Sequence, residues 1–222
     1  MRKLIVLSFI SLDGVMQAPG GPEEDPTGGY KHEGWVVGYF DDFLMKVMVK
    51  QTSMPFDLLL GRKTYEIFAA SWPYVSASED PFAAKLNSAK KYVASKTLTK
   101  LDWNNSELIK GDVVEGIKRI KEQEGPEIQV HGSGNLIQTL LRHDLADELW
   151  LKIFPITLGN GKRLFAQGTI PAGFKLVESE MSPTGVIVAS YERAGEVKTG
   201  NFGLETPSEA ELARRKKLKE EG

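Results

Sequence analysis

Cysteine is absent from the 222 residues of this chain. Its absence excludes disulfide bonds, thiolate catalysis and cysteine-ligated zinc, and it fits a cytoplasmic protein. Histidine is nearly as scarce: the three histidines are scattered along the chain, so we expect no metal site.

Long hydrophobic runs are also missing. A membrane-spanning helix needs roughly 20 apolar residues, and no run approaches that length. The first residues, "MRKLIVLSFISLDG", combine a basic start with an apolar run of about seven residues and no small-residue cleavage site. We therefore predict that they form a first strand rather than a signal peptide, and we expect no membrane partner.

An excess of either charge is lacking too. The chain has 28 Lys and Arg against 30 Asp and Glu, a formal net charge of −2. No overall field favours nucleic acid, so we expect no nucleic-acid partner, and any anion must be bound by a local cluster.

Eight short apolar stretches predict β-strands, and helical patterns lie between several of them. The predicted strands cover residues 3–10, 56–60, 91–94, 107–109, 127–131, 148–154, 174–178 and 186–192. The predicted helices cover 39–50, 112–124 with Asp112 as N-cap, 135–143, and a stretch that follows Thr64 as its cap. Strands that alternate with helices and end in a hairpin predict an α/β fold with a mixed sheet.

Two stretches interrupt this pattern. Residues 17–35 contain five Gly and three Pro, and we interpret them as a mobile loop over a site. The charged end of the chain predicts a solvated helix, with a role in dimer contacts as the alternative. We expect one domain over 1–194, with 17–35 as its lid, and a tail over 195–222.

Three of the predicted strands end in residues that suit phosphate. Strand 56–60 runs into Gly61-Arg62-Lys63-Thr64, strand 91–94 into Ser95-Lys96-Thr97, and strand 127–131 into Gly132-Ser133-Gly134. Helix N-termini present free N–H groups, and glycine allows a ligand to approach the backbone closely. Because ligands bind outside the carboxyl ends of such strands, we predict a nucleotide site there. The alternative for Arg62 and Lys63 is a pair of solvated surface cations.

With these motifs in order, the chain resembles the dihydrofolate reductase superfamily, in the branch of the reductase domain of the bifunctional riboflavin-biosynthesis deaminase/reductase. The resemblance covers about residues 2–193 and rests on "SLDGVMQAPGG", "LLLGRKTYEIF", "YVASKTL", "IQVHGSGNLIQTLL" and "DELWLKIFPITLGNGKRLF". It implies a three-layer fold with a mixed, mainly parallel eight-stranded sheet. It also implies hydride transfer from NADPH to a pterin or to a ribosylamino-pyrimidine imine, and a homodimer.

The resemblance assigns cofactor contacts by position. Arg62 would hold the 2′-phosphate of NADPH, and Ser95 and Lys96 would flank the adenosine phosphate. Residues at the pyrophosphate and nicotinamide would be Gly61, Lys63, Thr64, Gly132, Ser133, Gly134, Asn135 and Leu136. Those closing over the nicotinamide, with loop 17–35, would be Ile10, Ser11 and Gly14.

The chain departs from the folate-reducing branch. Ala89 stands near the position of an arginine that binds the glutamate tail of folate, and a Pro-Trp stretch before the first helix is absent. Both departures argue against folate as the substrate.

Reduction of a C=N bond is easier when an acid protonates the nitrogen. The candidate acids are Asp13 and Asp42, with Asp41 beside it; the alternatives are a turn residue for Asp13 and a first-turn charge for the helix aspartates. Trp35 and Tyr39 are candidates to stack a substrate ring, or else they pack the lid on the core. His131 is expected to pack in the core.

The sequence thus predicts an NADPH-dependent reductase of a small-molecule substrate. The alternative is a non-catalytic nucleotide- or pterin-binding module that acts as a sensor or ligand sink.

Overall fold

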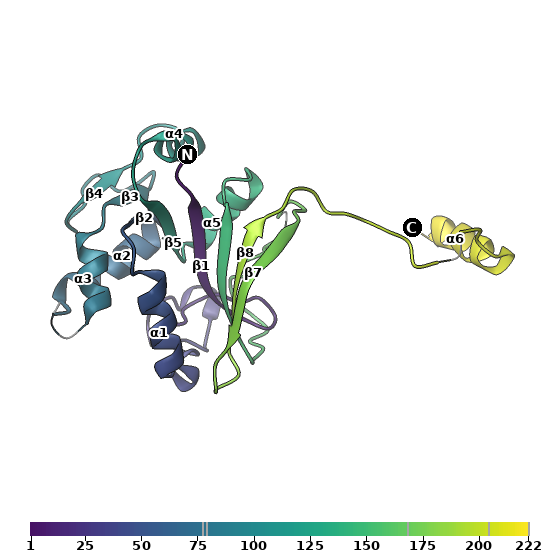
Figure 1. Ribbon diagram of the computed structural model, residues 1–222, viewed down its shortest axis with the longest axis horizontal. Helices are drawn as coiled ribbons and strands as arrows, with labels where there is room; N and C mark the ends of the chain where they lie inside the picture. The colour runs from purple at the N-terminus through teal and green to yellow at the C-terminus, as the bar shows by residue number, and fades with distance from the viewer. Residues whose placement is uncertain (77, 79, 168, 204, 222) are drawn as a thin grey trace.

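The eight strands form a single sheet in the order β4-β3-β2-β5-β1-β6-β8-β7 (Figure 1). This computed structural model describes residues 1–76, 78, 80–167, 169–203 and 205–221. The strands are β1 (Leu4–Ser11), β2 (Phe56–Gly61), β3 (Lys91–Ala94), β4 (Ser106–Leu108), β5 (Glu127–His131), β6 (Glu148–Phe154), β7 (Phe174–Met181) and β8 (Ile187–Arg193). β8 runs antiparallel to both of its neighbours, and the other pairings are parallel. The predicted mixed, mainly parallel sheet with a closing hairpin is confirmed.

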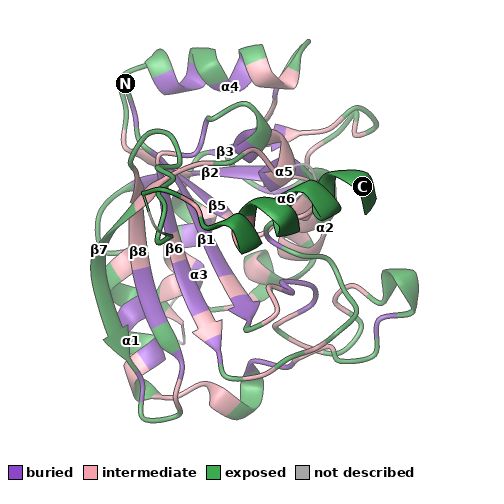
Figure 2. Cartoon of the chain, turned by 90° about the vertical axis from the view of Figure 1, so that its right-hand side faces the viewer, coloured by how far each residue is buried: buried purple, intermediate pink, exposed green. Residues whose placement is uncertain are grey.

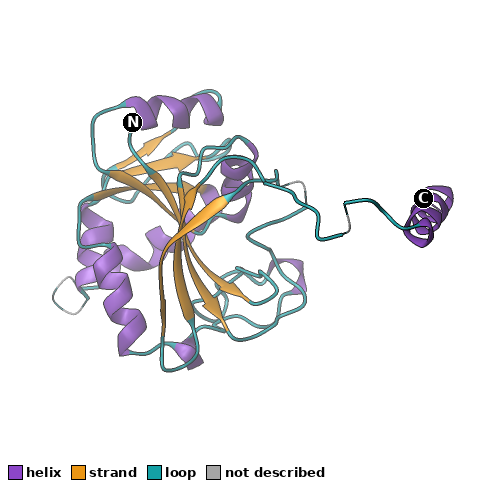
Figure 3. Cartoon of the chain, turned by 45° about the vertical axis from the view of Figure 1, so that its right-hand side comes forward, coloured by secondary structure: helices purple, strands orange, loops and turns teal. Residues whose placement is uncertain are grey.

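Helices cover both faces of this sheet (Figure 3). The helices are α1 (Asp42–Gln51), α2 (Arg62–Ser71), α3 (Pro81–Ser88), α4 (Val113–Glu122), α5 (Gly134–Arg142) and α6 (Glu209–Glu221), with short 3-10 turns at Thr27–Gly29, Val37–Tyr39 and Trp72–Tyr74. One face packs on α4 and α5. The other face packs on α1 at the β6 side and on α2 and α3 at the β2 side. These are the three layers that the resemblance implies.

Aspartates cap three of these helices. The carboxylate of Asp41 accepts a hydrogen bond from Leu44 N at the start of α1, Asp80 caps α3, and Asp112 caps α4 as predicted. Such caps satisfy the N–H groups that a helix start leaves free. The predicted cap at Thr64 is wrong: α2 begins earlier, at Arg62, with Gly61 as the residue before it.

The centre of the sheet and its β7 edge differ in exposure (Figure 2). β1 and β6 lie in the interior, whereas nearly every residue of the edge strand β7 is exposed. Helix α6 has no buried residue and stands apart from the sheet in Figure 1. Within the described residues, no helix has both the length and the apolar character that crossing a membrane requires.

Candidate functional site

A cleft of about 1780 Å³ opens at the carboxyl ends of the parallel strands. Its walls come from the starts of α2, α4 and α5, the end of α1 and the loop over residues 16–25. Strands β1 and β5 pair only as far as Leu7 and His131. Beyond that point β1 continues beside β6 alone, from Ser8 to Ser11. Residues from both sides of this split line the cleft, so it lies where a parallel sheet is expected to bind its ligand.

Two helices begin at the cleft without a side-chain cap. Gly61 precedes α2 and Ser133 precedes α5, and neither supplies a capping hydrogen bond. Three other helices of more than one turn have a described N-cap: α1, α3 and α4. Each of them is capped by an aspartate. The free N–H groups of α2 and α5, with the positive ends of their dipoles, suit a phosphorylated ligand.

Gly61 and Ser133 lie in contact between these two helices. The Gly61 N–H donates to Ser133 Oγ at 2.8 Å. A Cβ on Gly61 would lie 3.2 Å from the Ser133 Cβ, closer than ordinary packing allows. Gly61 itself has an extended backbone, with φ −78°, so the close approach rather than a special dihedral requires glycine here. Gly132 and Ser133 both have positive φ, 76° and 75°, which directs the chain sharply from β5 into α5.

Four cations surround this part of the cleft. Arg62 is half-exposed and pairs with Glu66 one turn along α2, at 3.0 Å. Lys63 lies 3.9 Å from the Asp25 carboxylate, which also pairs with Lys162. Lys96 lines the cleft beside Ser95. Arg62 and Lys63 are exposed, so an incoming phosphate could displace their carboxylate partners.

The loop over residues 17–35 is held in place by its own side chains. Gln17 Nε2 donates to the carbonyl oxygens of Asp25 and Thr27, and Trp35 Nε1 donates to the Gln17 oxygen at 2.8 Å. The Glu24 carboxylate accepts from two glycine N–H groups of the loop, and burial raises its pKa. The loop forms one wall of the cleft, as the predicted lid would; its mobility stays a prediction.

Sequence and structure comparisons place this chain in a family. The family model of the RibD C-terminal domain matches residues 2–188. The chain belongs to this family. It is 29% identical over 203 residues to the protein of Bacillus subtilis described as uncharacterized protein YyaP, covering 87% of this chain and 96% of that protein.

Solved structures share the fold of this RibD C-terminal domain protein. A putative riboflavin biosynthesis protein from Shewanella sp. PV-4 matches with TM-score 0.60 and 24% identity, covering 86% of this chain and 99% of that one. A dihydrofolate reductase from Enterococcus faecalis, complexed with NADP(H) and RAB-propyl, matches with TM-score 0.54 and 14% identity over 86% of this chain and 96% of that one. The dihydrofolate-reductase-like fold is therefore confirmed.

Most of the residues predicted to bind the cofactor lie together in the cleft of this RibD C-terminal domain. They are Gly61, Arg62, Lys63, Thr64, Ser95, Lys96, Gly132, Ser133, Gly134, Asn135 and Leu136. Ile10, Ser11 and Gly14 are not among the residues that line it. Ile10 packs in the core, and Ser11 Oγ donates to the Asp13 carboxylate at 2.6 Å.

The two candidate acids lie outside the lining of the cleft. The Asp13 carboxylate accepts from the N–H groups of Leu158 and Gly159 and so ties the end of β1 to the loop after β6. The hydrogen bond from Ser11 is the main cause that lowers the pKa of Asp13 to about 2. The two N–H groups lower it further, and together these hydrogen bonds outweigh partial burial, which raises it. Asp42 is an exposed first-turn residue of α1, next to the cap Asp41. Neither geometry supplies an acid to the described part of the cleft.

The two candidate stacking residues pack against the core instead. Trp35 and Tyr39 both make edge-to-face contacts with Phe154, at ring-centroid distances of 5.2 and 6.0 Å. Neither residue lines the cleft. Both therefore fit the alternative role, which is to pack the lid on the core.

Polar residues lie at the floor of the cleft, and among them only His131 was singled out from the sequence, as a core residue; His131 instead lines the cleft. Lys152 of β6 is buried, and its Nζ donates to Gln51 Oε1 at 2.5 Å. His131 Nε2 contacts Gln129 Oε1 at 2.8 Å, and Gln129 Nε2 donates to the Gln51 carbonyl oxygen. Burial lowers the pKa of Lys152 to about 7, and burial together with the Lys152 charge lowers that of His131 to about 3. A lysine within the apolar run "ELWLKIF" is the signal that could have found this floor.

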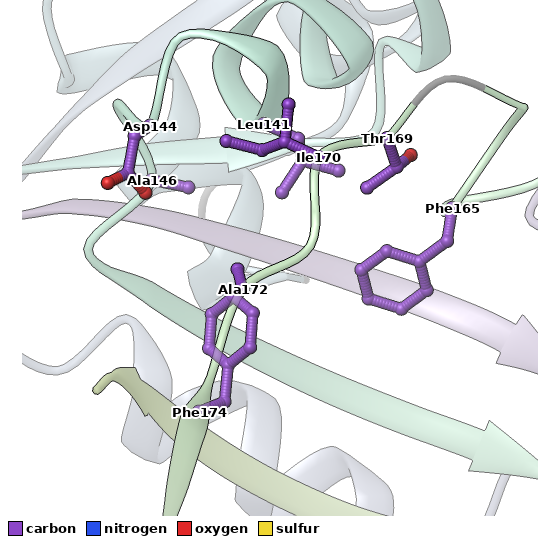
Figure 4. A pocket seen from close by; sticks show the side chains of 8 residues that line it. All are labelled: Leu141, Asp144, Ala146, Phe165, Thr169, Ile170, Ala172 and Phe174. Atoms are coloured by element: carbon purple, nitrogen blue, oxygen red, sulfur yellow. The ribbon is translucent and has the colours of Figure 1, made fainter. Parts of the chain in front are cut away.

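A second pocket is unlike the cleft. It has a volume of about 230 Å³ and lies between the end of α5 and the chain before β7 (Figure 4). Its walls are mainly apolar, with Leu141, Phe165 and Phe174 among them. Its size and its lack of cations make it unsuitable for a dinucleotide.

Proposed function

We propose that this chain is an NADPH-dependent reductase of a small heterocyclic substrate, either a ribosylamino-pyrimidine or a pterin. One observation carries the proposal: two uncapped helix N-termini, the Gly61–Ser133 contact and a group of cations meet in one cleft. Membership of the RibD C-terminal domain family and the fold shared with a dihydrofolate reductase complexed with NADP(H) support it.

The donor set of the cleft fits a phosphorylated dinucleotide. The first N–H groups of α2 and α5 would bind the pyrophosphate, and the lack of a Cβ on Gly61 leaves room for Ser133, which brings the two helix starts together. Arg62 would bind the 2′-phosphate once it leaves Glu66, with Ser95 and Lys96 beside it. When bound, NADPH would supply a hydride to the substrate. The wall formed by residues 16–25 would shield that step from water.

The test is a comparison of NADPH with NADH, FMN and folate by thermal shift. We expect NADPH to stabilise the protein most, because only NADPH carries the phosphate that Arg62 would bind. Oxidation of NADPH is then followed in the presence of a ribosylamino-pyrimidine or dihydrobiopterin. A protein that no dinucleotide stabilises would contradict the proposal.

The second candidate function is a non-catalytic binding module. The position of Asp13 and Asp42 outside the cleft favours it, because it removes both predicted proton donors. Tight binding of NADPH without oxidation by either substrate would support this alternative.

The proposed dimer involves the open edge of the sheet. β6 lies between β1 and β8 and therefore has no free edge for such a contact. Instead, Leu176, Val177 and Met181 of β7 and Ile187 of β8 are exposed. Light scattering that finds only monomer would remove this proposal.

A further inference from the structure

Lys152 differs from the other lysines that the described structure buries. Lys91 donates to two main-chain carbonyl oxygens, at 2.9 and 2.8 Å. Lys121 donates to one carbonyl oxygen and to the Asp147 carboxylate. Lys152 is 3% exposed and donates only to Gln51 Oε1. An ammonium group has three donors, so two of those on Lys152 have no acceptor among the described residues.

Lys152 lies beside the split in the sheet. It pairs with Phe9 of β1, two residues beyond the last β1–β5 pair at Leu7 and His131. Its Nζ lies 5.5 Å from the centre of the Phe9 ring. Leu7, Phe9, His131 and Lys152 all line the cleft. The unpaired ammonium donors therefore lie at the floor of the cleft, beside the split between β1 and β5, where a bound ligand could accept a hydrogen bond from them.

No carboxylate compensates this charge. Within the described residues, no acidic group lies within 4.0 Å of Lys152 Nζ. Buried charges are ordinarily paired, because desolvation of an unpaired ion is costly. A ligand that accepts a hydrogen bond would relieve that cost.

The groups around Lys152 are neutral near pH 7. β1 places Phe9 beside it, β8 places Val188 opposite it, and α1 contributes Gln51. The only titratable neighbour identified at the floor is His131 of β5, whose lowered pKa keeps it uncharged. Its Nε2 carries the proton, because Gln129 Oε1 must accept while Gln129 Nε2 donates to Gln51 O and Glu127 Oε1. The next charged groups along the strands, Glu127 and Glu148, lie at the opposite ends of β5 and β6.

We propose that Lys152 is the proton donor of the reductase and binds the heteroatom of the C=N or C=O bond that is reduced. This inference rests on the proposed function and supplies the acid that Asp13 and Asp42 do not provide. It selects substrates whose reduced bond ends in a hydrogen-bond-accepting nitrogen or oxygen.

The step balances without a further reactant. Bound NADPH would supply a hydride to the substrate carbon, and the π electron pair of the reduced bond would move to the heteroatom. That heteroatom forms a bond to a proton from Lys152 Nζ, and the N–H bond breaks to leave a neutral amine. Water returns the proton after the product leaves. A pKa of about 7 suits this exchange at neutral pH.

The first test is Lys152→Met, which keeps an unbranched side chain one atom shorter and removes the charge. We expect the thermal midpoint to stay or rise, NADPH binding to change little, and kcat to fall by about 10²–10⁴-fold. The matched control is Lys91→Met, a second buried lysine outside the cleft: it should lower stability but leave the kcat of the folded fraction unchanged. A Lys152→Met enzyme with kcat within about threefold of the wild type would overturn the proposal.

The second test is Gln51→Glu, which places a carboxylate on the Lys152 ammonium. A nearby opposite charge should raise the pKa of Lys152 by about 1–3. Because the acid must be protonated, kcat of the wild type should fall as pH rises through about 7. That fall should move to higher pH in Gln51→Glu, a change that a purely structural lysine would not cause. An unchanged pH profile would count against the proposal.

The third measurement needs no turnover. In protein labelled with ¹³C at lysine Cε, one NMR signal should titrate near pH 7, vanish in Lys152→Met and move to higher pH in Gln51→Glu. A Lys152 signal that titrates at the ordinary lysine pKa of about 10.4 would overturn the assignment. Failure of the proposed function is seen separately, because the wild type would then neither bind nor oxidise NADPH, whatever the NMR shows.

Discussion

Gly61 N–H donates to Ser133 Oγ at 2.8 Å and thereby joins the start of α2 to the start of α5. Gly61 ends β2 and Ser133 lies two residues beyond the end of β5, and these two strands are neighbours in the sheet although 72 positions separate the residues in the chain. The contact fixes the spacing of the two uncapped helix starts at the cleft.

Substitutions at Ser133 should separate its hydrogen bond from its backbone strain. Ser133→Ala removes the hydrogen bond and keeps the left-handed backbone, so we expect a loss of about 1–2 kcal/mol in the free energy of unfolding. Ser133→Gly removes the same bond but relieves about 1 kcal/mol of strain, so its loss should be smaller. Urea unfolding measures both, and a Gly variant less stable than the Ala variant would contradict this account.

Arg62 should decide the preference between the two dinucleotides. Arg62→Ala removes one charged contact to the 2′-phosphate, worth about 1.5–3 kcal/mol, so Kd for NADPH should rise about 10–100-fold. Kd for NADH should hardly change. Glu66→Gln is the matched variant: it frees Arg62 from its partner at 3.0 Å and should tighten NADPH. Equal weakening of both cofactors in Arg62→Ala would show that Arg62 does not bind the 2′-phosphate.

Asp13 should stabilise the fold in a pH-dependent way. Its pKa is lowered from 3.8 to about 2 in the folded state. The stabilisation is therefore complete above pH 3.8 and is lost as pH falls toward 2. Asp13→Asn should cost about 1–2 kcal/mol of unfolding free energy at neutral pH, and the difference should shrink in acid. Unchanged stability with a large loss of kcat would support the catalytic role predicted from the sequence instead.

Asp41 and Asp42 should differ despite being neighbours. Asp41 caps α1 through a 2.9 Å hydrogen bond from Leu44 N, so Asp41→Ala should cost about 1 kcal/mol. Asp42 makes only a first-turn dipole interaction, so Asp42→Ala should cost a few tenths of a kcal/mol. Thermal unfolding of the pair tests the order. A selective loss of turnover in Asp42→Ala would restore it as a candidate acid.

The strands were largely predictable because burial on both faces leaves near-continuous apolar runs. The predicted 148–154 and 127–131 coincide with β6 and β5. Helix boundaries were harder to predict where the sequence offers two possible starts. Thr64 has the side chain of a typical cap, but α2 begins two residues earlier, at Arg62, directly after Gly61. Helix α3 was not predicted, although Asp80 caps it and Pro81 begins it.

The candidate site was also only partly predictable from the sequence. Local motifs marked the phosphate side, because glycines and cations directly follow their strands and need no tertiary information to be noticed. The floor could not be found in this way, since it joins Gln51 to Lys152 across 101 positions. Asp13 and Asp42 became candidate acids because they are charged residues next to motif residues. The fold shows instead that Asp13 accepts hydrogen bonds from a loop and that Asp42 lies in the first turn of α1.

The central position of β1 in the sheet has a consequence for how the protein folds during synthesis. β1 pairs only with β5 and β6, which are synthesised more than a hundred residues later. During synthesis, the apolar segment from Leu4 to Ile10 therefore stays without a partner strand while three other strands and four helices are made. The centre of the sheet therefore forms late, through contacts between distant parts of the chain. Such folding is slow and leaves the apolar strand β1 exposed and prone to aggregation. Efficient production should thus depend on chaperones that shield β1 until β5 and β6 have been synthesised.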